Sequence, residues 1–369
     1  MKQNHKIGLP ILLKLGLLSF FISPFLQNAF SLSEKFEVYT ATQSLGMGNA
    51  ITADASGYAA LYHNPSGLAL FRKKNIELTP IDIQGGAGLT GIGLTSQSQT
   101  LGENRLNGPL KENPGKYVAF NYVAVPSFTM RGFGVSFLGS YQYAALSDGT
   151  NLDIDTRQDV GMVVGYGRYF AGNVIRVGIA AKGLIRNQLK GSYAHSTLAG
   201  LDEQGLQGLH KEGFAVGADF GAAVTIPTKY LPTLALSWKD VFDTRFSTST
   251  HLLNSAAVGT PDPIRQSFNT GFSIHPYLSN KLKQTWTVEW KNWERQDLPW
   301  RKHLHIGFQL EDERTFYVWL GLNELYPCAG VGYRVKGGTL EIGTYGQEVG
   351  GDGETKNDQR IFFRYTIGF

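Results

Sequence analysis

Cysteine and long apolar runs are nearly absent from this sequence. Cys328 is the only cysteine among 369 residues, so no disulfide can form within the chain. Beyond the N-terminal thirty residues there is no run of about 18 apolar residues, which a membrane-spanning helix requires. Charge is also sparse, at 17% of residues, and 34 basic residues nearly balance 30 acidic ones. Without a basic stripe, the composition argues against nucleic-acid binding.

Glycine and aromatic residues are abundant instead. The chain contains 45 Gly, 22 Phe and 17 Tyr. Glycine within strands allows curvature and close approach of backbones, and aromatic side chains gather at the interfaces of membrane barrels. The composition therefore favours a sheet protein that meets a membrane.

The N-terminus has the features of a secretory signal. Lys2 and Lys6 precede an apolar run over residues 7–26, and small residues follow between 29 and 33. This pattern predicts a signal peptide over 1–33, cleaved near 29–33. No cysteine lies nearby for lipid attachment, so the mature chain is expected to be periplasmic, secreted or a membrane barrel.

The last ten residues, 360–369, alternate between an apolar and a mostly polar face. The apolar face consists of Ile361, Phe363, Tyr365, Ile367 and Phe369. A final strand of this kind is typical of bacterial outer-membrane barrels, in which one face meets lipid and the other a polar lumen. The alternative is an ordinary edge strand of a soluble protein. The terminal Phe369 also predicts that the barrel assembly machinery engages this strand.

The remaining chain predicts an all-β, transmembrane antiparallel barrel over residues 75–369. Short periplasmic links, such as 126–130, and long outer loops, such as 84–115, 144–156 and 187–211, fit that architecture. Fourteen strands are expected, near 75–83, 116–125, 131–143, 157–170, 173–186, 212–225, 232–242, 265–275, 281–292, 302–310, 315–322, 326–335, 338–346 and 358–369.

The polar parity of these strands predicts a charged lumen. Arg176 and Lys182 alternate with aliphatic residues, and His303 and His305 share one strand face. An arginine or lysine on the lipid face would cost about 2–4 kcal/mol at mid-depth, so these side chains should point inward. Such residues form either a structural hydrogen-bonded network or a binding site. The two histidines are at most half of a metal site.

Residues 34–74 precede the barrel and are too few for a domain of their own. We expect a short helix over 53–62 with Asp54 as its N-cap, and a second short element that begins at Asn64 and Pro65. Gly46 and Gly48 predict a tight turn in which a Cβ atom would clash. The barrel interior is the natural host for this segment.

Here the chain resembles a known family. The runs 46–50 (GMGNA) and 62–68 (YHNPSGL), with Asp54 between them, look like the N-terminal hatch of FadL-type outer-membrane proteins. Ser66 stands where that family usually has alanine. Residues 321–350 resemble an uncharacterised branch of the same group. The resemblance implies a fourteen-stranded barrel plugged by the hatch, with passive uptake of long-chain fatty acids or other hydrophobic compounds that leave sideways through a gap in the wall.

The resemblance provides candidate site residues, and we expect no cofactor. The expected wall of a hydrophobic pocket is Phe36, Val38, Met47, Leu61 and Tyr62; packing of the plug against the barrel explains these residues equally well. Residues expected to hold the shape of the hatch are Gly46, Gly48, Asn49, Asp54, Asn64, Pro65 and Gly67. Candidate partners for a ligand carboxylate are Arg176, Lys182, Arg334 and Arg364.

Other readings remain open. Related barrels serve type IX secretion, so a permanently plugged barrel that binds a partner protein is the main alternative. A lateral gap would favour transport, and Gly161, Gly165 and Gly167 mark either such a break or strand curvature. We do not expect an enzyme, although the predicted outer loops carry three histidines beside serines and acids: His195, His210 and His251.

Overall fold

The computed structural model describes most of the expected mature chain. The described residues are 34, 36–70, 75–86, 103–247, 251–279, 281–312, 315–350 and 355–368. The predicted signal peptide and Phe369 lie outside them, as do residues 71–74 and 87–102. In the described part, no helix is both long and apolar enough to cross a membrane.

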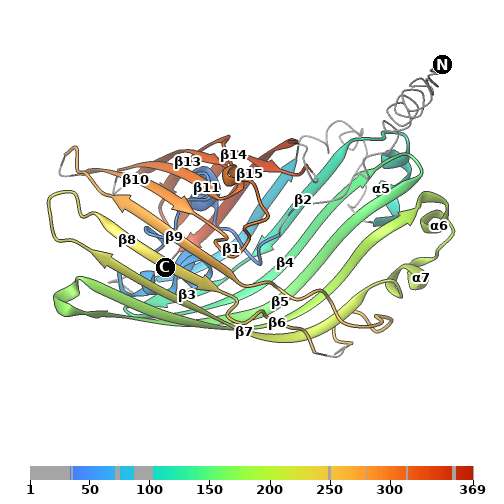
Figure 1. The fold of residues 1–369 in the computed structure, drawn as a ribbon, viewed down its shortest axis with the longest axis horizontal. Coiled ribbons are helices and arrows are strands. Elements are labelled where there is room, and N and C mark those ends of the chain that lie inside the picture. The colour runs from blue at the N-terminus through green and yellow to red at the C-terminus, as the bar shows by residue number, and fades with distance from the viewer. Residues whose placement is uncertain are drawn as a thin grey trace, which may run out of the picture.

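In the described part of the chain, fifteen strands form one antiparallel sheet, closed by pairing of the first strand with the last (Figure 1). They are β1 (Asn75–Gly86), β2 (Tyr117–Ala124), β3 (Ser127–Met130), β4 (Phe133–Ser147), β5 (Asn151–Phe170), β6 (Ile175–Ala194), β7 (Lys211–Thr225), β8 (Thr233–Lys239), β9 (Ser267–Ile274), β10 (Leu282–Trp290), β11 (Leu304–Asp312), β12 (Phe316–Asn323), β13 (Tyr326–Val335), β14 (Gly338–Glu348) and β15 (Asn357–Gly368).

The prediction of a fourteen-stranded barrel is confirmed. The short strands β2 and β3 both pair with β1 on one side and with β4 on the other. They therefore share one position in the wall, and the fifteen strands fill fourteen positions.

Among the described residues, helices are few and short. Three lie in the N-terminal segment, which Figure 1 shows inside the barrel, and the others follow the strands. They are α2 (Thr42–Gly46), α3 (Gly57–His63), η1 (Pro65–Leu70), α5 (Glu103–Lys111), η2 (Ala171–Asn173), α6 (His195–Ala199), α7 (Glu203–Gln207) and η3 (Trp300–Lys302).

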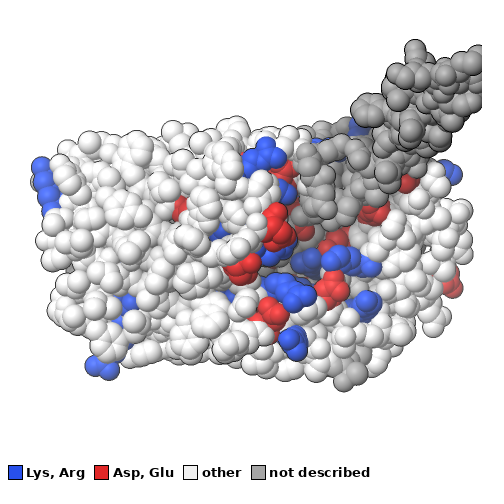
Figure 2. All heavy atoms as spheres, viewed as in Figure 1, with Lys and Arg blue, Asp and Glu red and all other residues white. Residues whose placement is uncertain are grey.

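The two faces of the wall differ as the alternation predicts. Large apolar side chains are exposed on the outside, including Phe137, Val216 and Ile361, and much of the wall in Figure 2 carries no charged side chain. Charged side chains such as Arg186 and Glu289 are buried inside. An apolar exterior around a polar interior suits contact with membrane lipid.

Three predicted connections are wrong. Residues 127–130 form β3, and the turn lies at 131–132, where Gly132 has a φ of 75°. The expected loop 144–156 is mostly strand, and so is the first part of 187–211. These polar stretches form strands because α5, α6 and α7 cover their outer faces with a buried apolar cluster. The cluster includes Leu106, Leu110, Leu152, Leu189, Leu198 and Leu206.

Candidate functional site

Two hatch residues act as the sequence predicts. Gly48 has a φ of 62°, and a Cβ atom there would lie 2.5 Å from the backbone nitrogen and oxygen of Leu322. Asn64 Oδ1 accepts a hydrogen bond of 3.1 Å from the backbone N–H of Ser66, so it caps η1. The close contact at Gly48 fixes the hatch against the wall, and the hydrogen bond of Asn64 fixes the hatch internally.

Asp54 is not a helix cap. The helix α3 begins at Gly57 after Ser56, and no side chain caps it. Asp54 Oδ1 instead lies 3.7 Å from Nδ1 of His275 on the wall. The remaining hatch residues are packed: a Cβ atom on Gly46 would lie 2.9 Å from Trp319, and one on Gly67 would lie 1.9 Å from the carbonyl oxygen of Ala55. Asn49 accepts from Ser44 Oγ at 2.8 Å.

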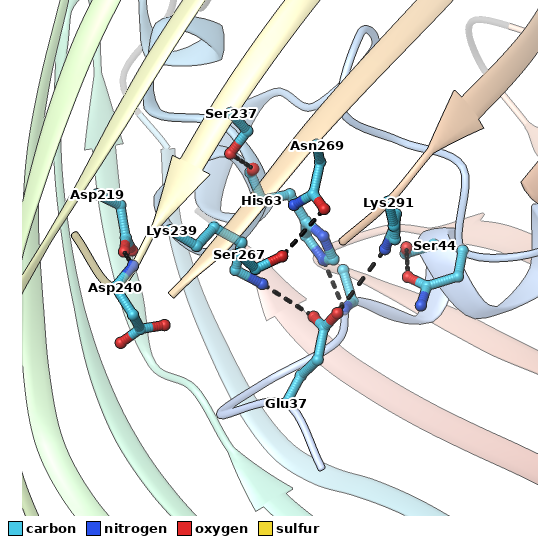
Figure 3. A network of polar contacts seen from close by, with 12 residues as sticks. Glu37, Ser44, His63, Asp219, Ser237, Lys239, Asp240, Ser267, Asn269 and Lys291 are labelled. Atoms are coloured by element: carbon cyan, nitrogen blue, oxygen red, sulfur yellow. Dashed lines mark hydrogen bonds and ion pairs between the residues drawn. The ribbon is translucent and has the colours of Figure 1, made fainter. Parts of the chain in front are cut away.

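The start of the hatch crosses the barrel mouth. We call this segment, Glu34 and residues 36–40, the strap. At one end Glu34 accepts hydrogen bonds of 2.6 and 2.7 Å from Arg360. Further along, Glu37 lies 2.9 Å from Lys239 and 3.8 Å from Lys291 (Figure 3). The strap is therefore tied by ion pairs to separate parts of the wall.

The charged groups around the strap set the protonation states of Glu37 and His63. Burial alone would raise the pKa of Glu37, but Lys239 and Lys291 more than offset it, so the pKa lies well below the usual 4.5. The imidazole of His63 accepts the backbone N–H of Ala41 at 3.2 Å through Nε2. Burial, reinforced by Lys239, lowers the pKa of His63 well below 6.5. The folded hatch thus holds Glu37 charged and His63 neutral.

These shifts predict that acid loosens the hatch. A released His63 takes up a proton below pH 6.5, whereas the folded one resists it, so stability falls by up to about 1.4 kcal/mol per pH unit. The contribution of Glu37 is present above pH 4.5 and is lost as the pH falls through its lowered pKa. Hydrogen exchange of the strap between pH 8 and 4 measures this. Protection should fall below pH 6.5, and less so in His63→Gln; constant protection from pH 8 to 5 would contradict it.

Two cavities meet at the strap, and Phe36 and Glu37 line both. The larger one, which we call the outer chamber, has a volume of about 140 Å³ and is lined by residues of the wall and of the outer loops. The smaller one, the inner cavity, measures about 30 Å³ and lies against the hatch. Leu45 and Asn49 of the hatch also line the outer chamber, and Asp240 and Ile264 from the connection between β8 and β9 also line the inner cavity. The strap therefore lies between two neighbouring cavities.

Four of the five predicted pocket residues gather at the inner cavity, and one does not. Phe36, Val38, Leu61 and Tyr62 line it. Met47 instead packs with Leu45, Trp319 and Phe362 in a separate cluster. Tyr62 also donates a hydrogen bond of 2.9 Å to Ser136 Oγ on the wall. In this conformation the inner cavity is nearly filled by the hatch itself.

An apolar cluster leads from the inner cavity to the wall. It joins Val38, Leu61 and Tyr62 of the hatch to Val123 and Val125, both fully buried. Those two valines lie where β2 gives way to β3. The same cluster includes Leu138, Val163, Ala180 and Leu184 of β4, β5 and β6, so the plug makes continuous apolar contact with the wall from β6 to the junction of β2 and β3.

The backbone pairing of the wall is interrupted at that junction, where Thr79 Oγ1 lies 3.5 Å from the carbonyl oxygen of Val125. β1 pairs with β3 through residues 75–77 and with β2 through residues 83–85, but no pair joins 78–82 to 123–126. On its other side, β1 shifts register against β15 between Leu78 and Ile81. Pro80 within β1 and Pro126 between β2 and β3 lack the N–H that a strand ladder needs, and these prolines are the sequence signal for the interruption.

The glycines proposed as a break do not mark one. β5 pairs with β4 and β6 through Gly161 and Gly165, and Gly167 pairs with Gly178 of β6. A Cβ atom at Gly165 would lie 2.6 Å from Leu61, and one at Gly167 would lie 2.9 Å from the carbonyl oxygen of Pro65. These two glycines give room to the hatch.

The four candidate carboxylate partners lie in the lumen, and three are already paired. Arg176 differs: it is 3% exposed, lies near Asp54, and its Nε has no partner. The pairs of the others are Lys182 with Asp219 and Asp240, Arg334 with Glu311, and Arg364 with Glu341.

His195, one of the three histidines in the predicted outer loops, makes two buried polar contacts. Its Nε2 lies 2.7 Å from Ser147 Oγ, and its Nδ1 lies 2.5 Å from Asn107 Oδ1. Ser147, His195 and Asn107 follow one another as a nucleophile, a base and an orienting group would in a catalytic triad. However, Ser147 and His195 are only 1% and 2% exposed, so a substrate does not reach them in this conformation. In this arrangement the three side chains join α5 and α6 to the end of β4.

His303 and His305, the two histidines predicted to share one strand face, contact different groups. His303 stacks on Trp290 with ring centroids 5.2 Å apart, and its Nδ1 lies 2.7 Å from the carbonyl oxygen of Lys291. His305 Nδ1 lies 3.0 Å from the carbonyl oxygen of Gly48. Among the described residues, no three His, Cys, Asp or Glu side chains gather as metal ligands would.

Comparison with known proteins identifies the fold. No family model and no curated protein matches the chain. Among solved structures, the toluene transporter TbuX of Ralstonia pickettii is 14% identical, with a TM-score of 0.50 over 89% of this chain and 98% of that one. The CymD monoaromatic hydrocarbon channel is 12% identical, with a TM-score of 0.51 over 91% and 98%. A deltaS2 mutant of the TodX monoaromatic hydrocarbon channel is 12% identical, with a TM-score of 0.51 over 91% of this chain and 99% of that one. At these identities the likeness is one of fold, and it agrees with the fold that the hatch resemblance implies.

Proposed function

We propose that the chain is a bacterial outer-membrane channel for passive uptake of small hydrophobic compounds. The observation that carries the proposal is the apolar cluster between the inner cavity and the interrupted wall. An apolar ligand gains about 0.8 kcal/mol per methylene on leaving water, so it favours such a route over a polar lumen. The toluene and monoaromatic channels named above share the fold, which supports the same class of cargo.

The route runs from outside to the membrane. A ligand enters the outer chamber, passes the strap at Phe36, and displaces Leu61 and Tyr62 at the inner cavity. It then follows Val123 and Val125 to the interruption and leaves sideways into lipid. The hatch opens and closes the route, because its side chains fill the inner cavity at rest.

The dimensions favour a compact ligand. A cavity of about 150 Å³ holds one benzene ring, and the outer chamber measures about 140 Å³. A long acyl chain would require a much larger opening of the hatch. We therefore place single-ring and similarly small compounds ahead of long-chain fatty acids.

Uptake of radiolabelled toluene by cells that carry the chain in their outer membrane tests this proposal. Leu61→Gln keeps the side-chain size but puts an amide into the route, so uptake should fall at least about fivefold. Met47→Gln makes a matched change in the separate cluster of the hatch and should leave uptake near the parent level.

Barrel content, checked by heat-modifiable mobility on gels, must be equal in all strains. Uptake no greater than in cells without the chain would overturn the proposal and favour a plugged barrel that binds a partner protein. Equal losses in both variants would show that the hatch as a whole matters, and not this route. Long-chain fatty acid, measured in parallel, tests the ranking of ligands.

A further inference from the structure

The outer chamber contains buried hydrogen-bond acceptors without partners. Asn121 Oδ1, Gln142 Oε1, His305 Nε2 and Asn323 Oδ1 all belong to residues of its lining and have no hydrogen bond of good geometry. One donor of the lining, Gln84 Nε2, also has no such bond. Buried polar atoms in native proteins are nearly always satisfied, and an unsatisfied one costs about as much as a lost hydrogen bond. A cluster of such atoms around one cavity points to a ligand that supplies the donors.

The identity of these atoms as acceptors follows from their neighbours. The amide nitrogen of Gln142 donates to the carbonyl oxygen of Glu37 at 3.0 Å, and that of Asn323 donates to the carbonyl oxygen of Gly346 at 2.7 Å. Exchanging oxygen and nitrogen in either amide would therefore break a hydrogen bond. Both side chains are more than nine-tenths buried, so bulk water does not satisfy their oxygens.

His305 presents a third acceptor. Its Nδ1 faces the carbonyl oxygen of Gly48, which can only accept, so this nitrogen carries the proton. In the neutral imidazole Nε2 then holds a lone pair. The carboxamide of Asn323 interacts with this imidazole, although its oxygen forms no hydrogen bond of good geometry. These two atoms therefore form a weakly satisfied polar pair in the same lining as the acceptor of Gln142.

The charge of the chamber indicates an uncharged ligand. Its lining contains equal numbers of acidic and basic residues, and groups of both signs surround a hollow on the face shown in Figure 2. The basic residues are largely compensated: Arg360 pairs with Glu34, and Lys291 lies 3.8 Å from Glu37. Arg295 lies 2.6 Å from Asp297. Lys302, the fourth basic residue of the described lining, lies near Glu324 of the same lining. Each described cation of the chamber therefore has an acidic neighbour.

We infer that the outer chamber binds a small uncharged aromatic compound that carries hydroxyl groups, with a dihydroxybenzene as the simplest example. The hydroxyls donate to the unpartnered acceptors, and Phe36, Leu45 and Leu298 of the lining contact the ring. The inference deepens the proposed function, on which it rests for passage beyond the strap. It assigns the entry site to hydroxylated aromatics in preference to plain hydrocarbons.

The test compares two ligands of matched shape. Catechol and o-xylene differ only in two hydroxyls against two methyls, so a site chosen by apolar burial alone would prefer o-xylene. Equilibrium dialysis against the full barrel in lipid nanodiscs, corrected with empty nanodiscs, measures both. We expect one saturable catechol site per barrel and binding of o-xylene at least about tenfold weaker. Equal binding, or preference for o-xylene, would overturn the inference without any variant.

Variants locate the site. Asn121→Leu and Gln142→Met each remove an acceptor and should weaken catechol binding about five- to tenfold, while o-xylene binding stays the same. Gln188→Met removes a buried wall amide outside the chamber and serves as the matched control. Catechol binding unchanged in both chamber variants would overturn the assignment. Because binding does not require passage, catechol can bind while toluene uptake fails, which separates this inference from the proposed function.

Discussion

Replacing Val125 by aspartate is expected to abolish most toluene uptake while the barrel remains assembled. Val125 is fully buried, belongs to the apolar cluster, and lies beside the interruption of the wall. A carboxylate there either stays charged and draws in water or becomes neutral, and burying it without partners costs several kcal/mol. Every apolar ligand on the proposed route would meet this group. Uptake should fall at least about tenfold.

The control is a second variant that places a carboxylate at another position in the lumen. Thr285→Asp serves, because Thr285 is fully buried on the inner face of β10 and its hydroxyl lies 3.2 Å from His275 Nδ1, a ready partner for a carboxylate. Val125→Thr, of the same shape, should give an intermediate loss. Normal uptake by Val125→Asp at equal barrel content would show that ligands do not pass this point.

The sequence predicted the barrel well because the relevant signal is local. Whether a side chain faces lipid or lumen depends on its parity within one strand, so the segments around Ile361 and Lys182 are enough to predict that the first is exposed and the second buried. The same is true of Asn64 as a cap and of Gly48 in its turn. The extended strands β5 and β6 were missed in part because the apolar cover of their outer ends comes from distant helices.

The site was less predictable because it depends on contacts between distant segments. Nothing near Glu37 in the sequence indicates that Lys239 and Lys291 will hold it. Phe36 and Leu61 were chosen as apolar hatch residues, but only the folded chain separates them from Met47. The interruption of the wall had a local signal in Pro126, which was read as a turn.

Replacing Glu37 by glutamine is expected to release the strap and to speed uptake. Glu37 carries the only negative charge that the strap places between Lys239 and Lys291, whose side chains are 13% and 6% exposed. In the variant Lys291 keeps Glu289 at 3.8 Å, but Lys239 loses its partner. Removing one partner of a buried ion pair costs at least about 2 kcal/mol. The closed strap should therefore open roughly thirtyfold more often. Where strap opening limits entry, toluene uptake rises by up to that factor.

The other end of the strap supplies the control. In Glu34→Gln, Arg360 keeps Asp358 at 2.8 Å, so no cation is left without a partner and the effect should be several-fold smaller. Protease sensitivity and hydrogen exchange of residues 36–40 measure opening directly, beside the uptake rate. Faster exchange with unchanged uptake would mean that a later step limits transport, and the Val125 region is then the place to seek it. Unchanged exchange in Glu37→Gln would show that packing of Phe36 and Val38, and not charge, keeps the strap closed.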